Sequence, residues 1–511
     1  MTAFIRWCAV VVLLLVLLTS GIRAAPANQL PAWQGKVEAW VIETAEVGET
    51  EFLIYLTEQA DLSGAEALLT KQDKGRYVFE RLTETARRTQ GSLIAALQAA
   101  GAEFRPYWVA NMIWARGDIK LVQEIASRPD VARLFANPWV RLEETAQLPE
   151  PLMPQAPQTV EWNIARVNAD DVWAAGYTGQ GVVVAGQDTG YDWDHPALIN
   201  QYRGWDGVAA NHNYNWHDAI HENNPNSPPG NPCGFDSPLP CDDYTHGTHT
   251  MGIMVGDDGL GNQIGMAPGA RWIGCRNMEQ GWGTPATYAE CYQWFIAPTD
   301  LTGNNPRPEL APDVINNSWS CPAAEGCTDP NVLLTVVDNV RQAGILTVHS
   351  AGNDGYSGCS SINTPAAIYA SSFTVGSTDI NDLIAPSSSR GPVTIDGSYR
   401  IKPDVVAPGV NIYSSIPGSG YSSKSGTSMA APHVAGLAAL LLSARPELKG
   451  QVHRIEELIE QSALPLFDST CGGVPDLLRP NNVYGWGRID SWAAFQSSLL
   501  DYLYFPLVIN P

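Results

Sequence analysis

The spacing of hydrophobic positions divides the chain into an apolar N-terminal run, a small mixed unit and a long region where apolar runs and amphipathic stretches alternate. In the small unit, between about residues 36 and 142, the spacing switches between that of a strand and that of a helix. Its expected strands are residues 52–56, 106–114, 131–135 and 139–142, and its expected helices are residues 78–100 and 119–127. This β-α-β-α-β order predicts a split βαβ sandwich, a small α+β unit.

Beyond residue 160 the apolar runs are short and continuous, and helical stretches separate them. Runs without polar alternation are typical of strands buried on both faces of a parallel sheet. The expected strands are residues 181–186, 273, 314–315, 345–348 and 373–375, and the expected helices include residues 287–295 and 331–343. This alternation over residues 160–498 predicts a doubly wound α/β domain with a mostly parallel sheet, which binds ligands at the carboxyl ends of its strands.

One helix is expected to be apolar all round and therefore buried in the core of this domain. It begins near Ser428 and runs to Ala444. Pro432 lacks an N–H group and is tolerated in the first turn, which places the helix start near Ser428. A hydroxyl in the first turn lies against free N–H groups and the positive end of the helix dipole. Ser428 is therefore either a helix cap or a nucleophile whose attack generates an oxyanion.

Two further polar motifs lie where strands end or helices begin. Asp188 follows the strand at residues 181–186 directly, and a tight glycine turn comes after it. His246 and His249 open a predicted helix with a spacing that zinc ligands can have, but no H-E-x-x-H glutamate accompanies them. We prefer to interpret His246 as a general base and His249 as a buried structural histidine.

Together these residues supply the groups that acyl transfer needs. Ser428 would be the nucleophile, His246 the base that takes its proton, and Asp188 the carboxylate that orients the imidazole. Asn353 follows the strand at residues 345–348. Its side-chain amide and the Ser428 N–H are placed to bind the developing oxyanion.

These motifs resemble the three signatures of subtilisin-like serine peptidases, and they occur in that family's order. The matching segments are residues 188–190, 246–249 and 426–432. The resemblance covers about residues 160–495 and implies a serine endopeptidase that cuts proteins or peptides. By the same resemblance Asp188, His246 and Ser428 form the triad and Asn353 is the oxyanion donor.

Two segments resemble the walls of that family's substrate cleft. They supply Ser318, Trp319 and Ser320 on one side, and Ser350, Ala351 and Gly352 on the other. Trp319 and Ser320 depart from the small-residue and glycine pattern that is usual beside the pocket, so the preferred side chain of the substrate stays open. Residues 211–243, 275–278 and 303–320 look most like the bacillopeptidase F type. The small unit is similar to the inhibitory propeptide of this family, a ferredoxin-like folding chaperone removed by self-cleavage.

The N-terminus indicates export. Arg6 precedes an apolar run from Cys8 to Leu18, and small residues follow up to Ala25, as in a secretory signal peptide. The run is too short for a membrane anchor, and we expect no membrane span. The expected division is a signal peptide (1–25), an inhibitory propeptide (26–144), a proline-rich processing linker (145–159), a catalytic domain (160–498) and a short apolar tail (499–511).

Charge and cysteine content fit a secreted protein. The chain has 53 acidic and 30 basic residues, which argues against nucleic acid as a partner. Of its nine cysteines, all but Cys8 follow the signal peptide, and this even number favours disulfides. The short loops 233–241 and 321–327 suggest two pairs, and the other four cysteines stay open. Catalysis of this type needs no cofactor, but loops 256–262 and 379–382 leave a structural calcium ion possible.

Two other classes of protein were weighed. An α/β-hydrolase esterase also uses Ser, His and Asp, but it requires a G-x-S-x-G elbow, and Ala430 stands where its last glycine belongs. Its histidine would follow the serine, where the chain offers only His433 and His453. A catalytically dead binding module would tolerate the loss of a catalytic group, whereas all four are present.

Overall fold

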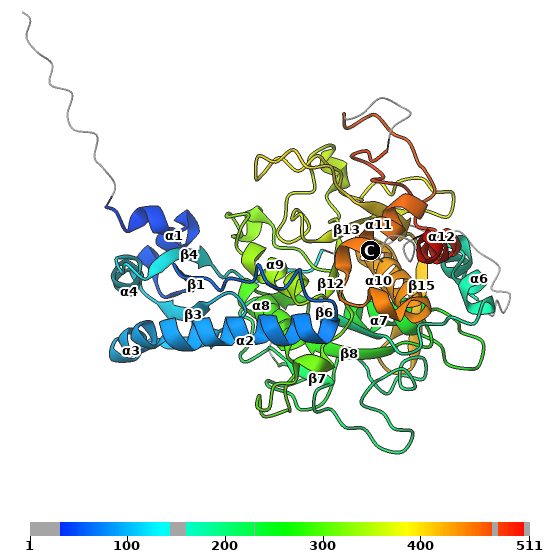
Figure 1. Cartoon of the computed structure of the whole chain (residues 1–511). Coiled ribbons are helices and arrows are strands. Elements are labelled where there is room, and N and C mark those ends of the chain that lie inside the picture. The colour runs from blue at the N-terminus through cyan, green and yellow to red at the C-terminus, as the bar shows by residue number, and fades with distance from the viewer. Residues whose placement is uncertain (1–30, 144–159, 229, 473–478, 505–511) are drawn as a thin grey trace, which may run out of the picture.

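The computed structural model of the chain describes residues 31–143, 160–228, 230–472 and 479–504. The expected signal peptide, the expected linker at residues 145–159 and the tail residues 505–511 lie outside these ranges. The described residues form a small N-terminal unit, blue to cyan in Figure 1, beside a larger α/β unit that contains the rest of the chain.

The larger unit contains a seven-stranded sheet whose paired strands run parallel, in the order β14-β13-β12-β11-β6-β8-β7. Its strands are β6 (Val183–Asp188), β7 (Trp216–Asp218), β8 (Arg271–Arg276), β11 (Val314–Asn317), β12 (Leu346–Ser350), β13 (Phe373–Thr378) and β14 (Val405–Pro408). The chain starts at β6 and extends outward in both directions, which places a topological switch point between β6 and β11. The predicted doubly wound parallel domain is confirmed; the short edge strands β7 and β14 were not predicted.

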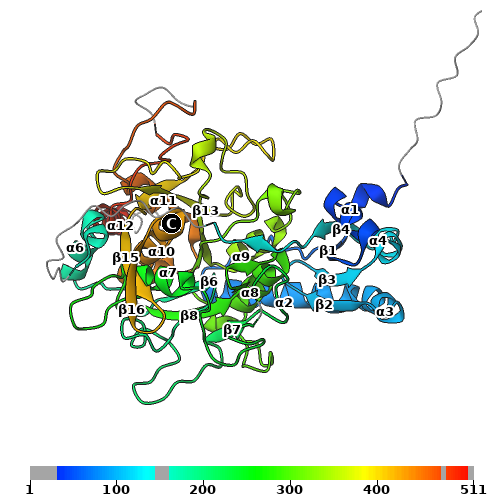
Figure 2. The same cartoon turned by 180° about the vertical axis from the view of Figure 1, so that it is seen from behind.

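Helices cover both faces of this sheet (Figures 1 and 2). Val184 and Val314 pack toward the central helix, whereas their neighbours Ala185 and Ile315 belong to the core on the opposite face. The first face is covered by α5 (Trp162–Arg166), α6 (Ala169–Ala174), α7 (His246–Val255), α10 (Thr427–Ala444), α11 (Val452–Ser462) and α12 (Ser491–Tyr504), and the second by α8 (Pro285–Ile296) and α9 (Leu334–Gln342).

The central helix α10 is buried from Thr427 to Leu442, as its apolar composition predicts. Among the described residues it is the one helix that is long and apolar enough to cross a membrane, but 89% of that stretch is buried inside the protein. At the end of the chain, α12 continues to Tyr504. The helix therefore crosses residue 498, where the apolar tail was expected to begin.

Smaller elements complete the larger unit. An antiparallel hairpin of β15 and β16 lies beside α7. These elements are β9 (Met278–Glu279), β10 (Trp282–Gly283), β15 (Ile412–Ile416), β16 (Gly420–Lys424) and 3-10 turns at Pro308–Leu310, Ala323–Glu325, Gly355–Ser357 and Pro446–Leu448.

The small unit has the split βαβ arrangement that the sequence predicts, with an antiparallel sheet in the order β2-β3-β1-β4. Its elements are a 3-10 turn (Gln34–Lys36), α1 (Ala39–Val47), β1 (Thr50–Leu56), α2 (Lys71–Thr89), α3 (Gly91–Ala99), β2 (Glu103–Tyr107), β3 (Met112–Gly117), α4 (Ile119–Ala126), β4 (Val131–Ala136) and β5 (Val140–Arg141). Two expectations were wrong. The strand at residues 106–114 is a hairpin that turns through Asn111, and the helix at residues 78–100 is two helices that meet at Gln90.

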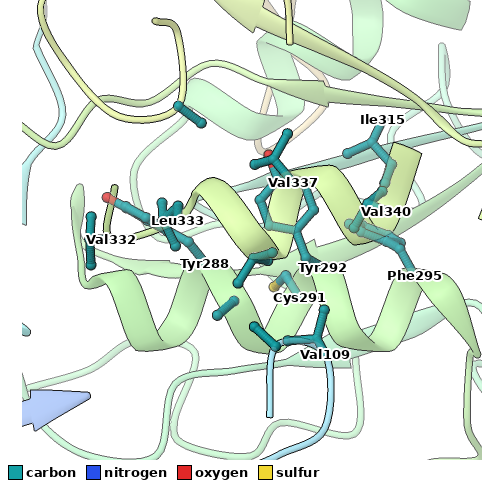
Figure 3. Close-up of a cluster of buried hydrophobic side chains, with 14 of the residues drawn as sticks. Val109, Tyr288, Cys291, Tyr292, Phe295, Ile315, Val332, Leu333, Val337 and Val340 are labelled. Carbon is teal, nitrogen blue, oxygen red and sulfur yellow. The ribbon is translucent and has the colours of Figure 1, made fainter. Parts of the chain in front are cut away.

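Both faces of the small sheet are buried. Phe52 and Ile54 of β1 pack against α1, α3 and α4, whereas Leu53 and Tyr55 point into a core shared with α8 and α9 of the larger unit. Figure 3 shows this shared core, where Val109 of the β2–β3 turn lies beside Cys291 of α8. The small unit thus completes a hydrophobic core of the larger one.

A buried ion pair also joins the two units. Lys71 at the start of α2 places its Nζ 2.9 Å from Asp313 Oδ1, and Lys449 Nζ lies 3.2 Å from the other oxygen of the same carboxylate. Burial alone would raise the pKa of Asp313, but the two ammonium groups hold it below its usual value. The desolvation cost of burying this carboxylate is offset by its two cationic partners, so losing either partner would destabilise the protein.

The eight cysteines of the larger unit lie in four pairs. Cys233 pairs with Cys241 and Cys321 with Cys327, as the short loops suggested. The four that the sequence left open are resolved as Cys275–Cys291 and Cys359–Cys471. The first of these joins β8 to α8, and the second joins segments 112 residues apart.

The packing of α10 generates a stability prediction. Alanine in place of a mid-helix glycine normally stabilises by about 0.5–1 kcal/mol. At Gly436, however, a Cβ atom would lie 2.3 Å from the Met266 Cβ. We expect Gly436→Ala to lower the free energy of unfolding by about 1–3 kcal/mol, measured by thermal unfolding. Gly91→Ala at the start of α3 is the control, because nothing lies within 4 Å of its new methyl group. A Gly436→Ala protein as stable as its parent would contradict the packing.

Candidate active site

Asp188 and His246 lie together at the carboxyl edge of the parallel sheet. Asp188 is the last residue of β6 and His246 the first of α7, and both are buried. His246 Nδ1 lies 2.8 Å from Asp188 Oδ1. The Thr189 N–H also donates to Oδ1 at 2.8 Å, and the Thr250 hydroxyl donates to Oδ2 at 3.3 Å. A neutral ring that donates its Nδ1–H to this carboxylate keeps Nε2 free as a proton acceptor.

A close approach of the chain to itself makes this contact possible. At Gly247 a Cβ atom would lie 2.1 Å from the Gly190 carbonyl oxygen, so the second residue of α7 has to be glycine. Asp242 fixes the same turn, because its Oδ2 accepts the Thr248 N–H at 2.9 Å and its Oδ1 accepts the Thr189 hydroxyl at 2.8 Å. The sequence analysis missed these supporting roles; the acidic residue before the histidine motif was the available signal.

His249 has a structural position, as expected. Its Nε2 lies 3.1 Å from the Ile412 carbonyl oxygen and 3.0 Å from that of Ser422, on the two strands of the β15–β16 hairpin. Burial, with the nearby charge of Lys424, lowers its pKa to about 3. The ring therefore stays neutral and ties α7 to the hairpin.

Ser428 is the second residue of α10, but Pro432 does not lie in the first turn as expected. It is inside the helix, where it cannot donate to the Ser428 carbonyl. The Ser318 hydroxyl supplies that missing bond at 3.1 Å. In return, the Ser428 hydroxyl donates to the Ser318 carbonyl at 3.4 Å, and it forms no hydrogen bond with His246 in the described chain. The helices α7 and α10, which carry His246 and Ser428, pack against each other.

Asn353 is held with its amide turned toward the N-terminal unit. Its Oδ1 accepts the Thr427 N–H at 3.0 Å and the Thr427 hydroxyl at 3.1 Å. Because the oxygen is fixed by these donors, Nδ2 points the other way and donates to the Glu143 carbonyl at 3.2 Å. The expected oxyanion donor thus already contacts a backbone carbonyl of the chain itself.

The Glu143 carbonyl lies two residues beyond the end of β5, which is added as a strand to the edge of β10 in the larger unit. β5 pairs antiparallel with β10, which opposes Arg141 to Trp282, and the Leu142 N–H donates to the Gly281 carbonyl at 2.8 Å. Val140 and Leu142 are buried. Adding an extended peptide to a sheet edge is a common way of binding peptides. The sequence analysis missed this edge, because a two-residue strand leaves no periodic pattern.

The two expected walls emerge from neighbouring parallel strands. Ser318, Trp319 and Ser320 follow β11; Ser350 ends β12, and Ala351 and Gly352 come next. The Trp319 ring stacks on Tyr288 of α8 with ring centroids 3.9 Å apart. Apart from the partly exposed Gly352, these wall residues are buried.

In the loops suggested for calcium, the aspartate carboxylates accept hydrogen bonds from the loop backbone. Asp258 Oδ1 accepts the N–H groups of Leu260 and Asn262, and Asp379 Oδ1 accepts those of Asn381 and Leu383. Within the described ranges, no group of three or more His, Cys, Asp or Glu side chains is placed to hold a metal ion.

Comparison with known proteins agrees with this architecture. Residues 179–487 match the model of the subtilase family. The chain belongs to the subtilase family. It is 37% identical to bacillopeptidase F of Bacillus subtilis over 84% of this chain and 29% of that protein. It is 32% identical to subtilisin of Bacillus pumilus over 66% of this chain and all of that protein. It is 29% identical to subtilisin E of Bacillus subtilis over 87% of this chain and 96% of that protein. This subtilase is a serine endopeptidase that needs no cofactor for catalysis.

A double-mutant cycle can test whether the Ser318 hydroxyl replaces the hydrogen bond that Pro432 cannot donate to the Ser428 carbonyl. Removing the hydroxyl in Ser318→Ala leaves the buried Ser428 carbonyl without a donor, and we expect a loss of about 1–3 kcal/mol of unfolding free energy. In a Pro432→Ala background the helix regains its own N–H donor, so the same change is expected to have a smaller effect. Thermal unfolding of the four proteins measures the coupling. Equal effects of Ser318→Ala in both backgrounds would show that Pro432 does not create the need for this hydroxyl.

Proposed function

We propose that this subtilase is a secreted enzyme that hydrolyses proteins and peptides through Asp188, His246 and Ser428, and that it is made as a self-processing preproenzyme. The observation that carries the proposal is the 2.8 Å contact between His246 and the buried Asp188 carboxylate, next to the helix that presents Ser428. Two unrelated parts of the sequence are folded together there in the geometry of a base and its orienting group.

The reaction follows from the roles of these groups. Ser428 Oγ attacks the substrate carbonyl while His246 Nε2 takes its proton, and the Asp188 carboxylate stabilises the imidazolium. The Asn353 amide and the Ser428 N–H bind the oxyanion of the tetrahedral intermediate. When the C–N bond breaks, His246 returns the proton to the leaving amine. Water then attacks the acyl-enzyme, with His246 as base, and restores the Ser428 hydroxyl.

The proposal makes the small N-terminal unit an inhibitory propeptide. Three contacts support this role: the shared core with α8 and α9, the ion pair between Lys71 and Asp313, and β5 in the place of a substrate strand. While β5 pairs with β10 and the Glu143 carbonyl contacts Asn353, another peptide has no access to the same groups.

Secretion is supported by the N-terminal sequence pattern and by the four cystine pairs. Disulfides persist in oxidising compartments and outside the cell. A protease whose own chain blocks its cleft until export would also be harmless to the cell that makes it.

The test compares the secreted wild-type chain with Ser428→Ala. We expect the wild type to lose the N-terminal unit, and Ser428→Ala to keep it covalently attached, because the nucleophile for self-cleavage is missing. Intact mass measures both, and a fluorophosphonate probe is expected to label the wild type only. A wild type that neither reacts with the probe nor hydrolyses a protein substrate would contradict the proposal. Cleavage of both chains would show that another protease performs the processing.

A histidine cluster lies where the two units meet, and it is expected to make the stability of the unprocessed chain depend on pH. The Tyr107 hydroxyl of the small unit donates to Glu290 of α8 at 2.9 Å. His217 Nε2 lies 2.9 Å and His221 Nε2 3.0 Å from the same carboxylate, and Asp236 lies 2.5 Å from His221 Nδ1. Burial lowers the pKa of His221, but Glu290 outweighs it, so the pKa is raised. Burial likewise raises the pKa of Glu290, and the histidines overcome this and hold it low.

The signs of these shifts define a pH window. The raised pKa of His221 adds stability that is complete below its ordinary value of 6.5 and is lost as pH rises through the raised value. The lowered pKa of Glu290 adds stability above its ordinary value of 4.5. In the Ser428→Ala chain we therefore expect His221→Gln to destabilise by about 1–2 kcal/mol near pH 5.5 and by less near pH 8.5, seen in thermal unfolding.

The matched control is His453→Gln, because His453 also contacts a glutamate, Glu457 at 3.3 Å, but its side chain is 76% exposed. We expect no measurable effect of His453→Gln at either pH. If His221→Gln had the same effect at both pH values, its contribution would be packing and not charge.

A further inference from the structure

Beyond β5 the chain reaches the active site at Glu143, two residues after Arg141. Its carbonyl oxygen accepts a hydrogen bond from Asn353 Nδ2 at 3.2 Å. In acyl transfer the oxyanion donors contact the carbonyl that the nucleophile attacks, and these contacts shorten as charge develops. Glu143 is therefore placed as the P1 residue, the residue on the acyl side of the bond that is cut.

The side chain of Glu143 meets hydrogen-bond donors. Its Oε2 accepts the backbone N–H of Asn353 at 3.2 Å. The Ser320 hydroxyl is buried and forms no hydrogen bond of standard geometry with the described residues. It lies near the Glu143 carboxyl and acts to lower its pKa. A donor that is buried and left unpaired is unfavourable, so an apolar P1 side chain would leave the Asn353 N–H unsatisfied and would offer the Ser320 hydroxyl no nearby acceptor.

The charges around Glu143 are of its own sign. Burial raises the pKa of the Glu143 carboxyl, and the carboxylates of Asp354 and Glu325 raise it further, against the opposing effects of the Asn353 N–H and the nearby Ser320 hydroxyl. The pocket thus offers hydrogen-bond donors to an oxygen atom, whereas the balance of burial and neighbouring carboxylates disfavours a negative charge. A protonated glutamate and a glutamine both satisfy these conditions.

We propose that this subtilase processes itself at the peptide bond that follows Glu143, and that Ser320 and the Asn353 N–H select substrates with glutamate or glutamine at P1. The proposal rests on the proposed function and adds a substrate class to the same site. In the cleavage the Glu143 carbonyl carbon is transferred to Ser428 Oγ, the amine of the next residue leaves with a proton from His246, and water releases the Glu143 carboxylate. Ser320 is a specificity-determining residue, replaceable without loss of the triad.

The first experiment measures kcat/KM of the mature enzyme on peptides acyl-Val-Arg-Leu-X-fluorophore, which copy residues 140–142. With X as Glu, Gln, Asp, Phe or Lys, we expect Gln, and Glu near pH 5, to be cut at least about tenfold faster than Phe or Lys. The preference for Gln over Glu is expected to grow as pH rises above about 4.5, because a bound carboxyl with a raised pKa must take up a proton. Faster cleavage after Phe or Lys than after Gln would overturn the proposal.

The second experiment tests whether Ser320 recognises the P1 side chain. Removing the hydroxyl in Ser320→Ala is expected to lower the Gln-to-Phe ratio of kcat/KM about five- to tenfold, whereas fluorophosphonate labelling of Ser428 stays intact. An unchanged ratio would remove Ser320 from the recognition of P1.

The third experiment reads the processing bond directly. In short reactions the released N-terminal unit is expected to end at residue 143 by mass in the wild type and in Glu143→Gln, and Glu143→Lys is expected to be processed more slowly. A first product ending elsewhere in the wild type would overturn the assignment. Failure of the proposed function is distinguishable: the enzyme would then neither label with fluorophosphonate nor cut any peptide, whereas a labelled enzyme that prefers Phe or Lys overturns only the P1 proposal.

Discussion

The burial of α10 is the constraint on which the rest of the active site depends. This helix packs against α7 and against β6, β11, β12, β13 and β14, so its N-terminal turn can occupy only one place above the carboxyl edge of the sheet. Pro432 inside the helix leaves the Ser428 carbonyl free, and Ser318 at the end of β11 takes that bond. The position of Ser428 is therefore set by core packing and by a hydrogen bond to the neighbouring strand, and both act before any substrate arrives.

The second constraint is that the outer apolar surface of α8 and α9 has to be covered by another part of the chain. Their outer side shares a core with Leu53 and Tyr55 of the small sheet, and the buried Asp313 takes a cationic partner from the same unit. A larger unit without the small one would expose this apolar area and leave that carboxylate with Lys449 alone. This gives a physical reason why the proposed propeptide would assist folding: it buries surface that the catalytic unit otherwise has to expose.

The sequence predicted secondary structure well where the hydrophobic pattern is long, and it failed at short turns and two-residue strands. The central strands of the parallel sheet and α10 were predicted, because continuous apolar runs are typical of segments buried on all sides. The β2–β3 hairpin was predicted as one strand, because its turn at Asn111 lies within an apolar stretch and contains no glycine or proline. Asp188, His246, Ser428 and Asn353 were proposed as site residues from their motifs. Asp242, β10 and the Glu143 contact were not, since their roles depend on residues distant in the sequence.

The sequence alone determined the fold class, the order of the units and the chemistry that the side chains can perform. These follow from local rules: hydrophobic periodicity, helix starts, and residue types whose reactivity is intrinsic. Only the tertiary structure decided which residues and segments are in contact. It paired four cysteines whose partners were open, it put the small sheet against α8 and α9, and it brought Glu143 to Asn353 across 210 residues of chain. Such contacts depend on the packing of whole layers, which no local pattern encodes.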